Sequence, residues 1–348
     1  MFKVRIGDRL IGEGEPVFIV AEVGVNHNGK VDLGKKLVDA AKISGADAVK
    51  FQTFKVQNVV TKYAEKADYQ KQASPKESQY EMLRKLELSF KNITRLFDYA
   101  NQRHITFLSS AFDKESVDLL DQLGVNAFKV ASGEITDFPL LRYIAEKKKP
   151  VILSTGMSTY EEVEEALSTL RKGGAEEIVL LHCVTSYPAR VEDANLRTIE
   201  TLRNRFKLPV GFSDHTQSIT VPVVAATLGA VLIEKHFTLS KNLPGPDHRA
   251  SLEPSEFKEM VAAVREVEKS LGDGEKRLTA DEEEIKKAVR RSIVARVRIA
   301  KGTVIREDML DFKRPGTGLR PRDLGKIVGK KTKKSIEADE LITFEKLC

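Results

Sequence analysis

Residues 17–24 read Val-Phe-Ile-Val-Ala-Glu-Val-Gly, an almost continuously apolar stretch with one charged side chain, Glu22, near its end. Such a run is typical of a β-strand that is covered on both faces, as strands are in a parallel sheet. Seven similar runs follow, at residues 48–53, 106–112, 127–132, 150–155, 178–183, 209–214 and 231–237. Amphipathic stretches with helical spacing separate the runs, and glycines such as Gly45 and Gly124 end several of these stretches. Eight strands that alternate with helices predict an α/β fold, a (β/α)8 TIM barrel.

The two ends of the chain and one insertion lie outside this repeat. Residues 4–12 predict a small hairpin that closes the bottom of the barrel. The insertion at about residues 54–90, with Tyr63, Tyr69 and Tyr80, is expected to cap one side of the mouth. Residues 273–290 are polar and charged, which is typical of a linker or a connecting helix.

The last segment has a different pattern from the barrel. Residues 292–299 alternate between apolar and polar side chains as a strand does, and Lys301-Gly302 supplies a turn. We therefore expect a barrel domain over residues 1–272, a linker over 273–290 and a small, mostly β domain over 291–348.

The composition excludes several classes of protein. Of the 348 residues, 41% are hydrophobic, which is enough for a sizeable core and excludes a disordered chain. No apolar run approaches about 18 residues, so we expect no membrane span. The first five residues lack the apolar stretch of a secretory signal, and the two cysteines, Cys183 and Cys348, cannot form a disulfide framework. We therefore expect a cytoplasmic protein.

The formal net charge of +6 is unevenly distributed along the chain. Residues 290–348 contain 16 lysines and arginines against 8 acidic residues, whereas residues 1–289 contain 41 against 43. The basic cluster Lys330-Lys331-Thr332-Lys333-Lys334 lacks the interleaved aromatic residues that favour nucleic-acid binding. We therefore expect no nucleic-acid partner, and interpret the segment as a basic lid over a pocket for acidic substrates.

Polar side chains collect at the carboxyl ends of the predicted strands, where barrel enzymes have their active sites. They are Glu22, Asn26, His27, Asn28, Lys50, Gln52, Ser109, Ser110, Lys129, Ser132, Glu134, Ser154, Thr155, His182, Thr185, Tyr187, Ser213, Asp214, His215, Glu234, Lys235 and His236. An ordinary core would not contain so many polar groups, because burying them without partners costs several kcal/mol. The pattern predicts a binding site at the barrel mouth.

Two lysines in one mouth, Lys50 and Lys129, predict that the site binds an anion such as a phosphate or a carboxylate. Hydroxyl groups at neighbouring strand ends add neutral donors, so a small phosphorylated acid fits this composition. Two other interpretations stay open. Lys50 can pair structurally with Glu22 or another carboxylate, or a lysine can form a Schiff base, as in many barrel aldolases.

His215 and His236 end adjacent predicted strands, so their rings can converge. Two imidazoles would leave a divalent ion several open positions for water and substrate oxygens. The alternative is a pair of hydrogen-bonded histidines at the barrel rim, and His182 is interpreted as a core histidine. Asp247 follows Pro244-Gly245-Pro246 in a stiff loop, where its carboxylate either binds sugar hydroxyls or belongs to an exposed turn.

The chain closely resembles the sialic acid synthase family in a set of strings that occur in the same order. They are Ala21–Gly29, Val49–Thr53, Ser132–Glu134, Leu153–Met157, Gly211–Thr216, Glu234–Thr238, Pro244–Asp247 and Lys313–Gly318. The resemblance covers essentially the whole chain. It implies a barrel followed by an antifreeze-like (SAF, β-clip) domain, and a homodimer in which that domain crosses onto the partner's barrel mouth.

The implied activity is that of a phosphoenolpyruvate-dependent transferase that forms a C–C bond. Phosphoenolpyruvate would condense with an N-acetylated mannose-type sugar to give a nine-carbon 2-keto sugar acid and phosphate. By resemblance, the residues that bind phosphoenolpyruvate are Lys50, Lys129, Ser132, Ser154 and Ser213, while Ser110 and Thr185 fall where relatives have other small polar residues. His215 and His236 match the ligands of a divalent ion, Mn²⁺ or Mg²⁺.

The resemblance also implies a sugar site. Gln52, Tyr187, Asp247 and Arg314 match sugar-binding positions, with Arg314 reaching in from the partner chain. Glu22 and Glu134 match carboxylates in the mouth, and we expect Glu134 to handle protons as a general base.

The identity of the acceptor sugar stays open in the sequence. N-acetylmannosamine and its 2,4-diacetamido-trideoxy analogue both fit, so the product could be N-acetylneuraminate, legionaminate or pseudaminate, and the motifs favour a free sugar over a 6-phosphate. Arg290-Arg291 either contact a substrate substituent or are solvated. The alternatives are a Schiff-base aldolase, or a phosphoenolpyruvate-dependent keto-acid synthase for another aldose. Nucleic-acid or ice binding by the last domain is disfavoured.

Overall fold

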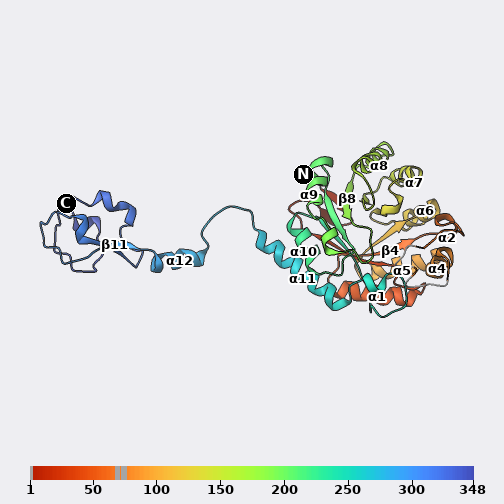
Figure 1. Ribbon diagram of the computed structural model, residues 1–348, viewed down its shortest axis with the longest axis horizontal. Coiled ribbons are helices and arrows are strands. Elements are labelled where there is room, and N and C mark those ends of the chain that lie inside the picture. The colour runs from red at the N-terminus through yellow and green to blue at the C-terminus, as the bar shows by residue number, and fades with distance from the viewer. Residues whose placement is uncertain (1–2, 67–70, 72–76) are drawn as a thin grey trace. The chain divides into compact units, whose positions relative to one another are not determined.

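The computed structural model describes residues 3–66, 71 and 77–348. The chain divides into two compact units, Met1–Gly272 and Asp273–Cys348, and each is described by itself. The first unit is a closed barrel of eight parallel strands surrounded by helices (Figure 1). This architecture confirms the predicted TIM barrel.

The barrel strands follow one another in chain order. They are β3 (Phe18–Gly24), β4 (Ala48–Thr53), β5 (Thr106–Ala111), β6 (Phe128–Val130), β7 (Val151–Ser154), β8 (Ile178–Cys183), β9 (Val210–Asp214) and β10 (Leu232–His236), and β10 pairs with β3 to close the barrel. Each lies inside one of the eight predicted runs. The prediction was too long at 127–132, because Ser132–Glu134 turn into a 3-10 helix directly after β6.

Helices cover the outside of the barrel. They are α1 (Val31–Ile43), α5 (Phe90–Gln102), α6 (Lys114–Leu123), α7 (Phe138–Ala145), α8 (Tyr160–Lys172), α9 (Thr198–Phe206), α10 (Thr220–Thr227) and α11 (Pro254–Leu271). Capping side chains and glycines determine where these helices begin and end. In α6, for example, the Asp113 side chain accepts from the backbone N–H of Ser116, and Gly124 ends the helix in the left-handed conformation with φ 77°.

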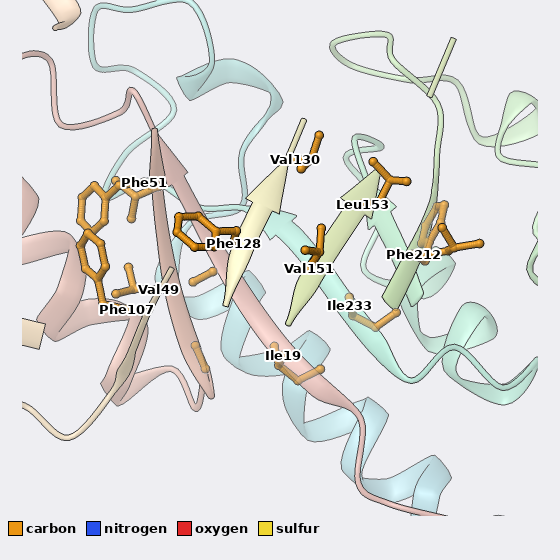
Figure 2. Close-up of a cluster of buried hydrophobic side chains, with 14 of the residues drawn as sticks. Ile19, Val49, Phe51, Phe107, Phe128, Val130, Val151, Leu153, Phe212 and Ile233 are labelled. Carbon is orange, nitrogen blue, oxygen red and sulfur yellow. The ribbon is translucent and has the colours of Figure 1, made fainter. Parts of the chain in front are cut away.

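Side chains on each barrel strand alternate between two cores, because successive residues of a strand point to opposite faces. On β3, Ile19 and Ala21 point outward and join the large core between strands and helices, whereas Phe18 and Val20 join a separate cluster inside the barrel. Figure 2 shows part of the outer core, where the Phe51 and Phe107 rings stack with their centroids 5.4 Å apart. The next inward residue after Val20 is Glu22, so the same alternation points a carboxylate into the barrel.

The hairpin predicted at residues 4–12 is confirmed. Strands β1 (Val4–Ile6) and β2 (Arg9–Ile11) pair antiparallel. Val4, Ile6 and Ile11 are buried in the inner cluster with Phe18, so the hairpin closes that cluster.

The insertion forms α2 (Val56–Val59) and α4 (Gln79–Leu86). Their buried side chains, including Val56, Met82 and Leu86, form a small satellite core. Tyr80 packs against this cluster, Tyr63 is 93% exposed, and Tyr69 lies outside the described residues.

The second unit has its own core, built from residues such as Ile293, Ile305 and Ile336. Strands β11 (Ser292–Ala295) and β12 (Leu310–Lys313) pair antiparallel. The predicted strand over 292–299 was too long, because the chain leaves β12 after Ala295 and Ile299 forms a bridge to Ile336 instead. The predicted linker contains a helix, α12 (Ala280–Val289), which begins at a capping box on Thr279.

Within the described ranges, no helix combines the length and the apolar character that crossing a membrane would require.

Candidate active site

A cavity of about 220 Å³ lies at the carboxyl ends of the barrel strands. Most of the predicted site residues line it: Glu22, Lys50, Gln52, Ser110, Lys129, Ser132, Glu134, Ser154, Thr185, Tyr187, Ser213, His215 and His236. The inward side chains of the strands change here from apolar to charged, since Lys50 follows Ala48 and Lys129 follows Ala127 at alternate positions. Because every second residue of a strand points into the barrel, the predicted residues come together in this cavity.

Two lysines and two glutamates form the centre of the cavity, and all four side chains are buried. Lys50 Nζ lies 2.8 Å from Glu22 Oε2 and 3.7 Å from Glu234 Oε2, and Lys129 Nζ lies 3.9 Å from Glu234 Oε1. The structural pairing of Lys50 with Glu22 is therefore present. Since Glu234 contacts both ammonium groups, the four charges form one network, which we call the charged quartet.

Burial and charge compete within the charged quartet. Burial raises the pKa of Glu22 to about 7, although Lys50 opposes the shift. Burial alone would lower the pKa of Lys50, but the carboxylates of Glu22 and Glu234 outweigh it and hold that pKa above the usual range for lysine. Burial lowers the pKa of Lys129, because the carboxylate of Glu234 compensates only in part. The carboxylates thus keep Lys50 charged at the centre of the cavity.

Hydroxyl groups surround the two ammonium groups. Lys129 Nζ donates to Ser154 Oγ at 2.7 Å, and Lys50 Nζ donates to Ser110 Oγ at 3.2 Å. Ser213 Oγ donates to Glu234 Oε1 at 2.9 Å. These hydroxyls hold the charged side chains in place and can also contact a bound anion.

The loop after β7 fits tightly against the same cavity. The backbone N–H of Gly156 donates to Ser132 Oγ at 3.0 Å. A β-carbon at Gly156 would lie 2.1 Å from Thr185 Oγ1 and 2.8 Å from Ser132 Oγ. Only glycine fits at this position, and its contacts hold Ser132 and Thr185 at the cavity wall.

His215 and His236 converge as predicted, with ring centroids 5.3 Å apart. The Nδ1 atom of His215 lies 2.7 Å from the carbonyl oxygen of Val184 and donates to it, so the lone pair of the neutral ring is on Nε2. Burial opposes protonation of this ring, but Cys183 and the Val184 carbonyl oxygen outweigh it and raise the pKa of His215. Burial lowers the pKa of His236 well below its usual value, so this ring is neutral, and its buried Nδ1 has no protein hydrogen-bond partner among the described residues. In their neutral forms, the two rings would each present a lone pair, which is a donor set that fits a divalent ion.

Among the described residues, no cluster of three or more His, Cys, Asp or Glu side chains could hold a metal ion. An ion bound by the two rings would therefore complete its coordination with oxygens of water or substrate. This composition resembles an open catalytic site and not a closed structural one.

Glu134 lies on the 3-10 turn after β6, with Oε2 buried and without a hydrogen-bond partner among the described residues. Burial raises its pKa to about 7, although Lys129 opposes the shift. A carboxylate with this pKa can accept a proton near neutral pH, which fits the predicted general base.

Asp247 is buried, but it lies in a second, smaller cavity of about 100 Å³. Gln52, Tyr187 and His236 line both cavities. The alternative of an exposed turn for Asp247 is therefore wrong. Arg314 is exposed in the second unit, directly after β12, and its predicted entry into a partner's site stays a prediction.

Two ionisable residues of the cavity, Glu234 and Cys183, had no predicted role. Glu234 lies between the two lysines. Its position at the end of a predicted strand indicated that it could belong to the site. The sequence does not reveal, however, which charged groups its side chain contacts. Cys183 also lines the cavity, with Sγ 3.8 Å from His215 Nδ1. His182 lies on the opposite face of β8, where its Nε2 is 2.8 Å from the carbonyl oxygen of Ala194, in agreement with a core histidine.

A buried ion pair connects the strands that carry the two histidines. Lys235 and Asp214 are neighbours in the β9–β10 pairing, and Lys235 Nζ lies 2.6 Å from Asp214 Oδ2. Lys235 also donates to the carbonyl oxygens of Thr216 and Ser218, while Asp214 accepts from the backbone N–H of Thr216 at 2.8 Å. This bridge joins the turn after His215 to the strand that ends at His236.

Both parts of the chain match models of known protein families or domains. Residues 37–276 match the NeuB family, and residues 290–347 match the SAF domain. The chain is 48% identical to the N,N'-diacetyllegionaminic acid synthase of Legionella pneumophila over 96% of this chain and 95% of the relative. It is also 48% identical to the synthase of the same name from Campylobacter jejuni, over 93% of this chain and 98% of the relative.

A solved structure is also similar. The crystal structure of N-acetylneuraminic acid (sialic acid) synthetase from Leptospira borgpetersenii aligns with a TM-score of 0.73 and 34% identity, over 82% of this chain and 95% of that chain.

The ion pair of Lys235 and Asp214 gives a prediction about stability. Lys235→Met should lower the free energy of unfolding by about 3–5 kcal/mol, because it leaves the Asp214 carboxylate buried without its partner. Urea denaturation measures this change. The double variant Asp214→Asn/Lys235→Met is the control and should lose less stability, since no charge is left unpaired. A loss of under about 1 kcal/mol in Lys235→Met would contradict the prediction.

Proposed function

The chain belongs to the NeuB family, and from this premise we propose that it condenses phosphoenolpyruvate with an N-acylated mannose-type sugar and water. The products are a nine-carbon 2-keto sugar acid, a nonulosonate of the N-acetylneuraminate or legionaminate type, and phosphate. The observation that carries the proposal is the charged quartet, in which Lys50 and Lys129 are buried together beside hydroxyl groups. Such a site suits the phosphate and carboxylate groups of phosphoenolpyruvate.

Binding of phosphoenolpyruvate would use groups that are already positioned. Lys50 and Lys129 contact its negative charges, and Ser132, Ser154 and Ser213 donate hydrogen bonds to its oxygens. Ser110 holds the Lys50 ammonium and Thr185 lines the wall beside Ser132. Because these side chains lie on or directly after rigid strands, little reorganisation would accompany binding.

The bond changes follow a simple order. The enol carbon of phosphoenolpyruvate forms a bond to the aldehyde carbon of the open-chain sugar, which leaves cationic character at the carbon that carries the phosphate. The π electrons of the aldehyde move to its oxygen, which takes up a proton from water and becomes a hydroxyl group. Water then adds to the carbon that carries the phosphate, and the resulting tetrahedral species expels phosphate. Glu134 accepts the proton of this water, while Glu22 keeps Lys50 charged and in place.

His215 and His236 would hold a divalent ion, Mn²⁺ or Mg²⁺, which supplies a Lewis acid for the aldehyde oxygen when bound. The sugar would be oriented by Gln52 and Tyr187, which line both cavities, and by Asp247, which lines the second. The expected homodimer, with the SAF domain over the partner's mouth and Arg314 at the sugar, belongs to the same proposal. Arg290 and Arg291 are both exposed, and no role is assigned to them.

The proposed reaction is tested by phosphate release. With purified protein and Mn²⁺, phosphate should be released from phosphoenolpyruvate only when an N-acylated mannosamine is also present, because the C–O bond breaks after the new C–C bond has formed. A colorimetric phosphate assay measures this dependence. Release without a sugar, or trapping of the sugar on a lysine by borohydride, would contradict the proposal and favour a phosphatase or a Schiff-base aldolase.

Glu134→Gln should retain binding of phosphoenolpyruvate and lose turnover by about 10²–10⁴-fold, since the amide cannot accept a proton. In the unchanged protein the basic form of Glu134 is the active form. The rate at saturating substrates should therefore fall about tenfold per pH unit below the pKa of about 7, and stay constant above it. Rates measured from pH 5 to 9 test this profile. Near-normal turnover of Glu134→Gln would remove Glu134 from this role.

Removal of the metal gives an independent prediction. Titration of the chelated protein with Mn²⁺, followed by calorimetry, should show binding that His236→Ala abolishes, because one of two ring ligands is lost. His182→Ala is the matched control and should bind Mn²⁺ normally, since its ring lies on the other face of β8. Equal Mn²⁺ affinity in His236→Ala and the unchanged protein, or full activity after exhaustive chelation, would contradict the proposed metal site.

A further inference from the structure

Three aromatic side chains meet at the barrel mouth, where His215 follows β9, His236 ends β10 and Tyr187 lies in the loop after β8. The ring centroid of Tyr187 lies 4.2 Å from that of His215 and 5.5 Å from that of His236. The two imidazole centroids are 5.3 Å apart, so each ring packs against the other two. We call these three side chains the ring cluster.

The phenol ring of Tyr187 contacts the two imidazole rings in different ways. It is tilted by 35° to the His215 ring, against which it packs closely, and by 79° to the His236 ring, which it meets edge to face. Offset stacking and edge-to-face packing are both favourable arrangements for aromatic pairs. One side chain therefore restrains the rotation of both histidine rings.

The two histidines differ in the hydrogen bonds that hold them. His215 Nδ1 donates to the carbonyl oxygen of Val184, whereas the buried Nδ1 of His236 has no hydrogen-bond partner among the described residues. Metal-binding histidines commonly donate their second ring N–H to such an acceptor, which fixes the orientation of the ring. The His236 ring is restrained instead by its packing against Tyr187 and His215.

Tyr187 is held in place by a loop that is hydrogen-bonded to His215 on both sides of the tyrosine. Before Tyr187, the carbonyl oxygen of Val184 accepts from His215 Nδ1 at 2.7 Å. After it, the backbone N–H of Ala189 donates to the carbonyl oxygen of His215 at 2.9 Å. The loop from Val184 to Ala189 thus closes around His215 and keeps the phenol ring against both imidazole rings.

We propose that Tyr187 is a positioning residue for the divalent-ion site, because its ring fixes the orientation of His215 and His236. This inference rests on the proposed function, in which the two histidines hold the ion. Tyr187 contributes no ligand of its own. It acts by removing rotational freedom from the two imidazole rings before the ion binds, and a site prepared in this way binds its ligand more tightly.

The positioning role is separate from the sugar contact expected of the same side chain. Tyr187 lines both cavities, so it can contact the sugar as well as the histidines. A residue that only contacted the sugar would change the KM for the sugar and leave the Mn²⁺ affinity of the sugar-free protein unchanged. A residue that positions the histidine rings changes the Mn²⁺ affinity without any substrate present.

Calorimetric titration of the chelated, substrate-free protein with Mn²⁺ tests this role. Tyr187→Leu should lower the Mn²⁺ affinity by about tenfold, because the rings of His215 and His236 lose the aromatic surface that orients them. Tyr187→Phe keeps the ring and should bind Mn²⁺ within about twofold of the unchanged protein. In the phosphate-release assay, the Mn²⁺ concentration for half-maximal rate should rise in Tyr187→Leu by the same factor as the dissociation constant.

Two further variants make the comparison specific. Phe112→Leu is the matched control, since Phe112 is a half-buried aromatic residue of the same cavity whose ring packs edge to face on Phe54, with centroids 6.1 Å apart. This variant should keep the Mn²⁺ affinity. Tyr187→Met fills a similar space with a flexible side chain and should behave as Tyr187→Leu does, so the test does not depend on one variant. Melting temperatures show that the variants are folded.

The possible failures are distinguishable. Unchanged Mn²⁺ affinity in Tyr187→Leu and Tyr187→Met would overturn this inference alone, and so would an equal loss of affinity in Tyr187→Phe or Phe112→Leu. Absence of Mn²⁺ binding by the unchanged protein would overturn the proposed metal site and this inference with it. Absence of sugar-dependent phosphate release, with Mn²⁺ binding that follows the predicted order of variants, would contradict the proposed reaction and leave the positioning role supported.

Discussion

Two lysine ammonium groups are buried side by side in the barrel mouth, and they stay charged there only because carboxylates or an anionic ligand face them. Glu22 pairs with Lys50, and Glu234 lies within 4 Å of both lysines. Removing one partner from such a network leaves an uncompensated charge, which costs far more than a surface ion pair contributes. The surrounding hydroxyls, the tight turn at Gly156 and the rigid strand ends all serve to hold this arrangement.

The barrel divides its interior into an apolar lower part and a charged upper part. Phe18, Val20 and Leu232 fill the inside near the β1–β2 hairpin, and one strand step above them the inward side chains become Glu22 and Glu234. The outward residue Lys235 meanwhile pairs with Asp214 and ties together the strands that carry the histidines. Ion pairs on both faces of the same strands thus hold the site: the inward ones lie in the cavity, and the outward one joins the strands that carry the histidines.

The sequence predicted the barrel and most of its mouth, because strand periodicity and strand ends are local properties. A residue two positions beyond an apolar inward side chain points to the same face, which is why Lys50, Lys129 and Ser154 were found. The bridging role of Glu234 was not predicted, because it depends on which strands become neighbours and how far each side chain reaches. The packing of α4 against the loop after β3 was missed for a similar reason, since the close contact of Gly29 with the carbonyl oxygen of Lys85 joins segments far apart in the sequence. The length of the β11 strand was overestimated. The alternation of apolar and polar residues continues beyond Ala295, although the backbone stops pairing with β12 there.

The central claim is that phosphoenolpyruvate is held by the charged quartet while water attacks the carbon that carries its phosphate. Phosphoenolpyruvate labelled with ¹⁸O at the oxygen between carbon and phosphorus tests this claim most directly, with mass spectrometry of the released phosphate. The account predicts that the label leaves with phosphate, because the C–O bond breaks. Label retained in the keto acid product would mean that the P–O bond breaks instead, and would contradict the account.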